Sequence, residues 1–478
     1  MTEMISNPTA APAAAHGPGP GDGWSDELAT AHRALSDVDL AFREEARRSP
    51  ELLDRETFQA MEPDGDLVDR PVQPWPTFVG REKEAELAAA SLGVCALLKS
   101  VPERLFGNDP AALARAYGLP QQLVDVALAE PNGLATTIAR GDFILTAEGW
   151  RCIEFNISSR LGGWESQLIL ERARQVPALA RFCARENVAF ACRDTLRELF
   201  AHVLAAARRQ GLLEGGELNV AIVRDRREAA RRATVERFHQ QLAASCAELA
   251  DGLVGRVFEA RAEDVVLWRN DLYLGRLRVH AVIVWSADTP KPVYRSFKMG
   301  RIALFNGPVE HVLSNKLALA LLSENAERDV FSAAERALIA RHVPWTREVV
   351  AGRRLDFRGE PRPLEELLAA HREELVLKKG FSHGGYGVAM GRFTAPEAWL
   401  DLGRQAAAQG GWEIQEIVES LPYLYQTGAR GCAPHEVIWG PFVFGDRYAG
   451  AFLRMQPKSA RDLVNLSQAA SQGVLVEV

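Results

Sequence analysis

Three oxygen-bearing side chains, Asp142, Glu154 and Asn156, fall in a short stretch where two strands are predicted. The run DFILT at 142–146 reads as one strand, AEGW as a turn, and RCIEF as the returning strand. Because side chains alternate along a strand, Glu154 and Asn156 lie on one face, about 7 Å apart. In a hairpin Asp142 reaches that face too, which gives an oxygen-only site suited to Mg²⁺ with bound phosphates. An ordinary hairpin with a solvated polar face explains the same residues.

A glycine-rich loop between two predicted strands (375–390) forms a second group of candidates, much further along the chain. The backbone N–H groups of 382–387 would point at phosphate oxygens, and Lys378 or Lys379 would neutralise charge. The loop carries neither a Walker sequence nor the protein-kinase motifs, and a plain β-turn is the other interpretation. The glycines that would let the backbone approach a ligand closely are Gly380, Gly384, Gly385 and Gly387.

Lysine is rare in this chain, since only 8 of the 56 basic residues are Lys. Lys316 lies in an apolar run that predicts a helix (KLALALL), either as a phosphate-binding lysine or as a surface residue whose ammonium reaches solvent. The segment 412–420 (WEIQEIVES) alternates apolar and polar residues. That pattern fits a strand that holds adenine through backbone groups and Glu416, and it fits a half-exposed strand of an ordinary sheet.

Composition limits the classes of function. A chain of 478 residues with 47% apolar residues is long enough for several domains. The net charge of −7 provides no basic field, so nucleic acid is not an expected partner. The six cysteines show no C-x-x-C pair or metal-ligand spacing, which indicates reduced thiols in a cytoplasm. No continuous apolar run of 18 residues and no secretion signal is found, so we expect no membrane span.

Together these motifs resemble glutathionylspermidine synthetase and its circularly permuted ATP-grasp relatives. In ordinary ATP-grasp enzymes the E-x-N motif follows the lysines, whereas here it precedes them. The resemblance covers about residues 130 to 470 and leaves the N-terminal 130 residues uncovered. The motifs that carry it are R-x-D-F at 140–143, E-x-N at 154–156, Lys316, V-L-K at 376–378, G-G-x-G at 384–387 and Q-E at 415–416.

The resemblance implies a ligase that depends on ATP and Mg²⁺. A substrate carboxylate would attack the γ-phosphate to give an acyl phosphate and ADP, and an amine would then displace phosphate. Relatives usually have Pro where this chain has Lys379, so which lysine meets the phosphate is left open. By position, the resemblance implies that magnesium would be held by Asp142, Glu154 and Asn156, and that the ATP phosphates would be contacted by Lys316 and Lys378. Arg140 would contact the phosphate that is transferred, and Arg454 would brace the acyl phosphate. The adenine pocket would be lined by Gln415, Glu416 and Val418.

The expected fold class is α/β with α+β lobes, an ATP-grasp arrangement with permuted motif order. A helical N-terminal region and a small parallel α/β domain without a dinucleotide motif accompany it. The predicted segments are a disordered tail (1–23), a helical region (24–130), a metal-binding lobe (131–215), the small α/β domain (216–310), an ATP-binding lobe (311–430), and C-terminal strands that complete the metal lobe (431–478).

Two other functions stay open from the sequence: a nucleotide-binding partner protein without turnover, and a phosphotransferase. The expected partners of a ligase are a small carboxylate and a small amine, such as an amino acid or short peptide. No amidase-like N-terminal region is found, so we expect a ligase only. The sequence identifies neither substrate, and it leaves the oligomeric state open, a homodimer included.

Overall fold

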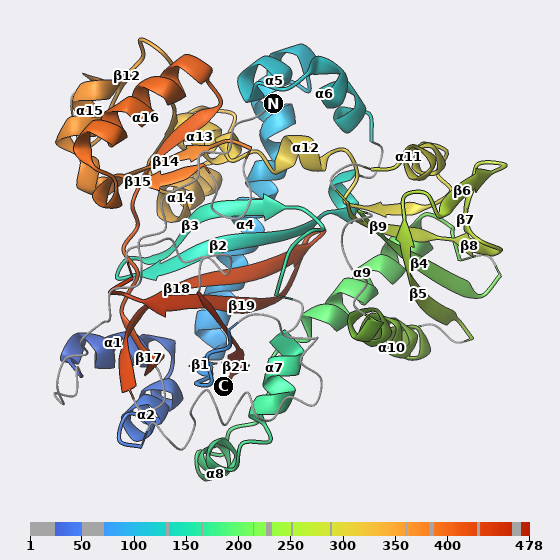
Figure 1. Cartoon of the computed structure of the whole chain (residues 1–478), viewed down its shortest axis with the longest axis horizontal. Helices are drawn as coiled ribbons and strands as arrows, with labels where there is room; N and C mark the ends of the chain where they lie inside the picture. The colour runs from blue at the N-terminus through green and yellow to red at the C-terminus, as the bar shows by residue number, and fades with distance from the viewer. Residues whose placement is uncertain are drawn as a thin grey trace.

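The computed structural model describes most of the chain as a mixed α/β protein with several sheets (Figure 1). The predicted tail (1–23) and two loop glycines, Gly384 and Gly385, lie outside the described residues. The described ranges are 24–49, 71–130, 133–163, 166–213, 215–225, 232–249, 252–286, 289–359, 361–381, 387–427, 431–460 and 470–478.

A central antiparallel sheet joins the predicted hairpin to strands from the C-terminal end of the chain. Its order is β20-β19-β18-β2-β3, and β17 pairs with β18. Trp439 of β18 lies opposite Phe143 of β2, so the returning strands complete the sheet that the hairpin begins (Figure 1). The strands are β2 (Ile138–Thr146), β3 (Gly149–Ile157), β17 (Tyr423–Thr427), β18 (Gly431–Phe444), β19 (Arg447–Pro457) and β20 (Ser471–Gly473).

One long helix, α4 (Arg81–Phe106), packs against β3, β18 and β19 of this sheet and against α13 and α14. Its length and composition would allow it to cross a membrane, but half of its most apolar window is buried inside the fold. Such burial is typical of a core helix. The elements before and after it are α1 (Asp26–Leu35), α2 (Asp37–Ala46), β1 (Thr77–Val79), α5 (Pro110–Tyr117), α6 (Gln121–Leu128) and η2 (Gly133–Thr136), and β1 pairs with β21 (Leu475–Glu477).

The upper lobe, residues 317–416, has a four-stranded antiparallel sheet of order β11-β16-β14-β15 and its own buried core, which includes Trp399 and Ile414. It lies above one end of the central sheet (Figure 1). Its elements are α13 (Leu317–Glu324), α14 (Ala333–His342), β11 (Thr346–Glu348), β12 (Arg354–Leu355), β13 (Arg362–Pro363), α15 (Leu364–Ala370), η3 (Arg372–Glu374), β14 (Leu375–Lys379), β15 (Val388–Met390), η4 (Gly391–Phe393), α16 (Pro396–Gln409) and β16 (Trp412–Glu416).

A parallel sheet of order β10-β9-β4-β5 lies on the other side of the molecule, with α9 and α10 packed against it. A separate antiparallel sheet, β6-β7-β8, lies beside it. The elements are β4 (Glu217–Arg224), α10 (Arg232–Leu249), β5 (Val254–Arg261), β6 (Val265–Trp268), β7 (Asp271–Leu274), β8 (Leu277–Val279), β9 (Ala281–Trp285), α11 (Lys291–Lys298), β10 (Ala303–Phe305) and α12 (Glu310–Leu313).

Two helix predictions are corrected by the structure. The residue pattern from Ser166 to Leu212 predicts one long helical stretch, whereas the structure has three helices there, because Pro177 begins a new helix and Asp194 caps another. They are α7 (Ser166–Ala173), α8 (Pro177–Arg185) and α9 (Thr195–Arg209). Lys316 was expected on a helix face, whereas it is the N-cap residue of α13, in the break after α12.

Candidate functional site

The β2–β3 hairpin brings four predicted site residues together. Asp142 lies directly opposite Glu154, and Arg140 lies opposite Asn156. The register shifts between Asp142 and Phe143, and such a bulge re-aims the side chains next to it. Two cross-strand pairs therefore carry an amide, a guanidinium and two carboxylates at neighbouring positions.

Two arginines share the Asp142 carboxylate. Arg454 Nη2 lies 2.5 Å from Asp142 Oδ1 as an ion pair without hydrogen-bond geometry, and Arg140 Nε lies 3.4 Å from the same oxygen. Arg140 also donates to Gly162 O at 3.0 Å, and both guanidinium groups lie near the Phe452 ring, at 4.8 and 5.6 Å from its centroid. Burial lowers the pKa of Arg140 to about 10, although Asp142 opposes this shift. Arg140 therefore remains a cation at neutral pH.

Glu154 forms an ion pair with Lys316, whose Nζ lies 2.9 Å from Glu154 Oε1. Burial raises the pKa of Glu154, but the ammonium groups of Lys316 and Lys378 outweigh burial and bring that pKa to about 2. Burial likewise lowers the pKa of Lys316, and the Glu154 carboxylate outweighs it, so that the pKa is raised overall. The pair is therefore fully charged at neutral pH.

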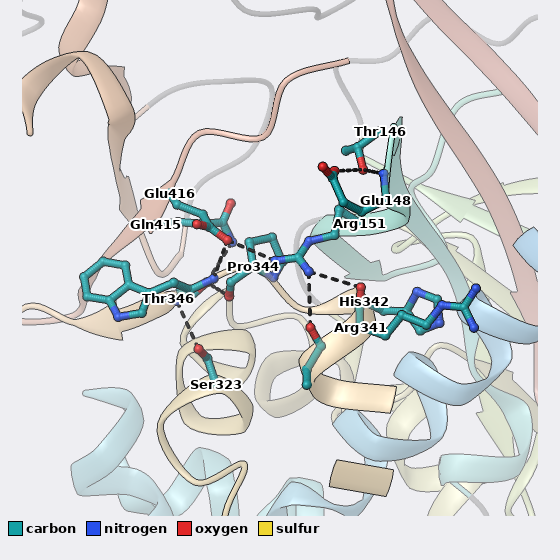
Figure 2. Close-up of polar contacts among 12 residues, drawn as sticks. Thr146, Glu148, Arg151, Ser323, Arg341, His342, Pro344, Thr346, Gln415 and Glu416 are labelled. Atoms are coloured by element: carbon teal, nitrogen blue, oxygen red, sulfur yellow. Dashed lines mark hydrogen bonds and ion pairs between the residues drawn. The ribbon is translucent and has the colours of Figure 1, made fainter. Parts of the chain in front are cut away.

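Lys378 bridges the upper lobe and the hairpin. Its ammonium donates to Ile153 O at 2.7 Å and to Gln415 Oε1 at 2.6 Å. Gln415 Nε2 donates to Thr346 Oγ1 at 3.0 Å, which fixes the amide orientation (Figure 2). Burial lowers the pKa of Lys378 from its ordinary value, and the carboxylates of Glu413 and Glu154 oppose that effect.

In this charged cluster four basic groups, those of Arg140, Arg454, Lys316 and Lys378, surround two carboxylates, so both carboxylates already have basic partners. The arginine contacts use Asp142 Oδ1 and the Lys316 contact uses Glu154 Oε1, so Mg²⁺ would share these two carboxylates with their basic partners or displace those partners. Carboxylate and amide oxygens suit Mg²⁺, which usually takes one or two protein carboxylates together with waters and phosphates. No group of three His, Cys, Asp or Glu residues is arranged for a metal in the described ranges.

Arg151, whose position in the sequence gives no sign of a role, joins the hairpin to the upper lobe at a second place. Its Nη1 donates to Ala340 O at 3.2 Å and to Arg341 O at 3.1 Å, at the carboxyl end of α14. Its Nη2 lies 3.0 Å from Glu416 Oε1, which also accepts from Trp345 N at 2.9 Å (Figure 2). The Glu416 carboxylate thus holds Arg151 and the backbone before β11.

A cavity of about 730 Å³ lies between the hairpin turn and the segment that follows β16. Two of the three residues predicted to contact adenine, Glu416 and Val418, line it, whereas Gln415 does not. The Glu416 carboxylate at this wall is already engaged by Arg151 and by Trp345 N. The walls are Glu27, Thr146, Ala147, Glu148, Arg151, Glu416, Ile417, Val418, Glu419, Ser420, Leu421, Pro422 and Lys458.

Lys378 and Lys379, the two candidates for the lysine that contacts phosphate, differ in burial. Lys378 is buried, whereas Lys379 is exposed. Gly387 has a φ of +70°, a conformation that favours glycine, and its carbonyl accepts from Lys379 N at 2.8 Å. The roles assigned to Gly384 and Gly385 lie outside the described residues.

Comparison with known proteins supports the fold. No protein-family model and no curated protein sequence matches the chain. A solved structure of a glutathione synthetase-like effector from Globodera pallida, in its apo form, is similar with a TM-score of 0.56 and 11% sequence identity. The match covers 93% of this chain and 99% of that chain.

The chain therefore has a mixed α/β fold of the glutathione synthetase-like kind. Identity as low as this shows a shared fold and does not extend to activity. The comparison tests neither the permuted motif order nor the resemblance to glutathionylspermidine synthetase, and both stay predictions.

Proposed function

We propose that the protein is an ATP- and Mg²⁺-dependent ligase that joins a carboxylate to an amine, with the motif order of a circularly permuted ATP-grasp enzyme. The observation that carries the proposal is the contact of Lys316 with Glu154 and of Lys378 with Ile153 O, which joins the 316–378 part of the chain to the β2–β3 hairpin. Lysine ammonium groups beside carboxylates are what a magnesium-bound polyphosphate requires.

In this proposal the chain positions charge and supplies no covalent nucleophile. Lys316 and Lys378 hold phosphate oxygens, and Asp142, Glu154 and Asn156 hold Mg²⁺, which neutralises the phosphates when bound. A substrate carboxylate oxygen bonds to the γ-phosphorus as the bond to ADP breaks. The amine nitrogen then bonds to the acyl carbon, phosphate leaves, and the nitrogen loses a proton.

Arg140 and Arg454 complete the arrangement at Asp142. Both guanidinium groups are buried beside Phe452, where a charge interaction is less screened than in water. If Asp142 binds a magnesium ion, N–H groups of the two arginines are released from its carboxylate and can donate to the phosphoryl group that is transferred. The substrates remain a small carboxylate and a small amine, as the sequence analysis expects.

Product analysis tests the reaction class. With Mg-ATP and a panel of amino acids, short peptides and polyamines, we expect ADP and phosphate only when one acid and one amine are both present. AMP and pyrophosphate would overturn the acyl-phosphate chemistry. ADP release that needs the acid alone and leaves a stable phosphorylated product would indicate a phosphotransferase, and Mg-dependent nucleotide binding without any product across the panel would favour a binding protein.

A cavity-filling substitution tests the adenine assignment. Val418→Trp adds an indole to the wall of the 730 Å³ cavity, and we expect it to raise the Kd for Mg-ATP by at least about tenfold, ~1.4 kcal/mol. Val350→Trp is the matched control, since Val350 is 41% exposed in the same lobe and does not line the cavity. Equal affinity in both variants, measured by calorimetry, would place the base elsewhere.

A further inference from the structure

Glu413 is a buried carboxyl group to which the mechanism above gives no task. It lies on β16 directly opposite Lys378 of β14, and its Oε1 is 4.0 Å from Lys378 Nζ. Its side chain is only 1% exposed, and neither carboxyl oxygen has a hydrogen-bond partner within the described residues. A buried polar group without a hydrogen bond destabilises the folded state, so its presence calls for an explanation.

The Lys378 ammonium has several acceptors at this place. It donates to Ile153 O and Gln415 Oε1, both at less than 2.8 Å, while the Glu413 carboxyl group stands slightly further off. A phosphate that arrives at Lys378 must compete with these acceptors. Of these three groups only the Glu413 carboxyl group can carry a charge, so when it is ionised its attraction for the ammonium opposes phosphate binding most strongly.

We propose that Glu413 is a positioning residue for Lys378. The Glu413 carboxylate competes with nucleotide phosphates for the Lys378 ammonium and thereby sets the affinity of the site for magnesium-bound nucleotide. The inference rests on the proposed function, because it assumes that Lys378 binds phosphate.

The surroundings of Glu413 decide how this competition depends on pH. Burial raises the pKa of Glu413 to about 7, and the Lys378 and Lys316 ammonium groups oppose that shift. The carboxylate of Glu154 on β3 also acts on Glu413, and Glu348 of β11 lies opposite it in register. Helix α16 packs on β16 with apolar residues, Trp399 and Ala406 among them.

The direction of the pH effect follows from the charge. Below about pH 7 the Glu413 carboxyl group is neutral and does not oppose phosphate binding at Lys378, whereas above about pH 7 its negative charge attracts the Lys378 ammonium and opposes that binding. Nucleotide binding should then weaken as pH rises. At alkaline pH the Glu413 carboxylate should take up a proton when the nucleotide binds. If binding requires the neutral form, the Kd rises about tenfold from pH 6 to pH 8.

The test is calorimetric titration of the full-length protein with magnesium and the non-hydrolysable analogue AMP-PNP at pH 6, 7 and 8. We expect wild type to lose about tenfold in affinity over this range, while Glu413→Gln keeps the affinity of wild type at pH 6 throughout. Glu84→Gln is the matched control, because burial also raises the pKa of Glu84 to about 7, but this residue lies on α4 and its charged neighbours are Glu477 and Arg193. This control should keep the wild-type pH dependence.

Titration of wild type in buffers of different ionisation enthalpy measures proton uptake and requires no variant. Uptake that approaches one proton at pH 8 supports the proposal. A wild-type affinity that is independent of pH, or a Glu413→Gln variant that binds more weakly at every pH, overturns it while nucleotide binding itself stands. Absence of Mg-dependent binding in wild type at all three pH values overturns the proposed function, and this inference with it.

Discussion

Glu154→Gln should lower the rate of ADP formation by roughly 10²–10³-fold while the protein stays folded. The substitution keeps the size of the side chain and its place opposite Asp142, but it removes the negative charge that is 2.9 Å from Lys316 Nζ. In the proposed site that charge holds magnesium against the phosphates, and a neutral amide is a weaker ligand for a hard cation. Steady-state ADP release at several Mg²⁺ concentrations measures both the loss and the weaker dependence on metal.

A matched control separates the site from the loss of any ion pair. Glu217 forms a pair with Arg256 at 3.0 Å, with side chains 44% and 34% exposed, on the parallel sheet away from the proposed metal site. Glu217→Gln removes a carboxylate from a pair of similar length and should leave turnover unchanged. If Glu154→Gln kept the wild-type rate, Glu154 would not be part of the proposed metal site.

The same substitution has a signature in stability. Because the pKa of Glu154 in the fold is about 2, well below its ordinary value, the carboxylate stabilises the folded state at neutral pH. That contribution is at most about 3 kcal/mol, and solvent screening reduces it since the side chain is 22% exposed. It is lost as pH falls through the range from about 4.5 to 2. The difference in free energy of unfolding between wild type and Glu154→Gln should therefore shrink towards pH 2, as urea titrations at several pH values can show.

The hairpin that carries Asp142 and Glu154 could be predicted from the sequence because its signals are local. Alternation of apolar and polar residues, with a turn between two runs, defines strands and faces without reference to the rest of the chain. The structure has β2 and β3 at these residues, and Asp142 lies opposite Glu154. What the pattern could not supply is the partner of each carboxylate, since Lys316 and Arg454 arrive from distant parts of the chain.

The error at Lys316 has a physical cause. The run LALALL strongly favours a helix, and the sequence pattern predicts that this helix includes Lys316. Asn315 Oδ1 accepts from Leu317 N, and Lys316 N donates to Gly380 O at 3.0 Å, so the backbone is drawn towards β14 and the helix starts one residue later. This is a tertiary contact overriding local preference.

Arg151 and Glu413 gave no signal in the sequence that separates them from other charged residues on strands. Both acquire their importance from tertiary packing. Arg151 donates to a carbonyl at the end of α14, and Glu413 is buried away from solvent beside Lys378. Strand alternation does place Glu413 on the same face as Gln415, which is the one local clue that the sequence offers.

The N-terminal helices are attached to the rest of the fold by a fully buried network around Asp39. Asp39 Oδ2 lies 2.6 Å from His32 Nδ1, and Asp39 Oδ1 accepts from Arg43 Nη2 at 3.2 Å and from Phe78 N at 2.9 Å. His32 Nε2 accepts from Leu424 N at 2.9 Å, so the ring proton is on Nδ1 and points at Asp39.

The charges in this network favour that arrangement. Burial lowers the pKa of His32, which keeps its ring neutral. Burial raises the pKa of Asp39, but Arg43 and the hydrogen bonds outweigh it, so the carboxylate remains charged. The Arg43 guanidinium lies 4.4 Å from the centre of the Tyr425 ring and donates to Pro76 O at 2.7 Å. One carboxylate thereby connects α1, α2 and β1, and through His32 it reaches β17.

Asp39→Asn should lower the free energy of unfolding by about 3–5 kcal/mol, because it leaves the buried Arg43 charge without its counterion. Asp37→Asn is the matched control. Asp37 is also on α2 and forms an i,i+4 pair with Arg33, but that pair is 3.9 Å long and its side chains are 93% and 62% exposed. Exposed pairs of this kind contribute about 0–1 kcal/mol, so the control should be nearly as stable as wild type in urea denaturation. Equal stability of the two variants would show that the Asp39 network does not hold the N-terminal helices in place.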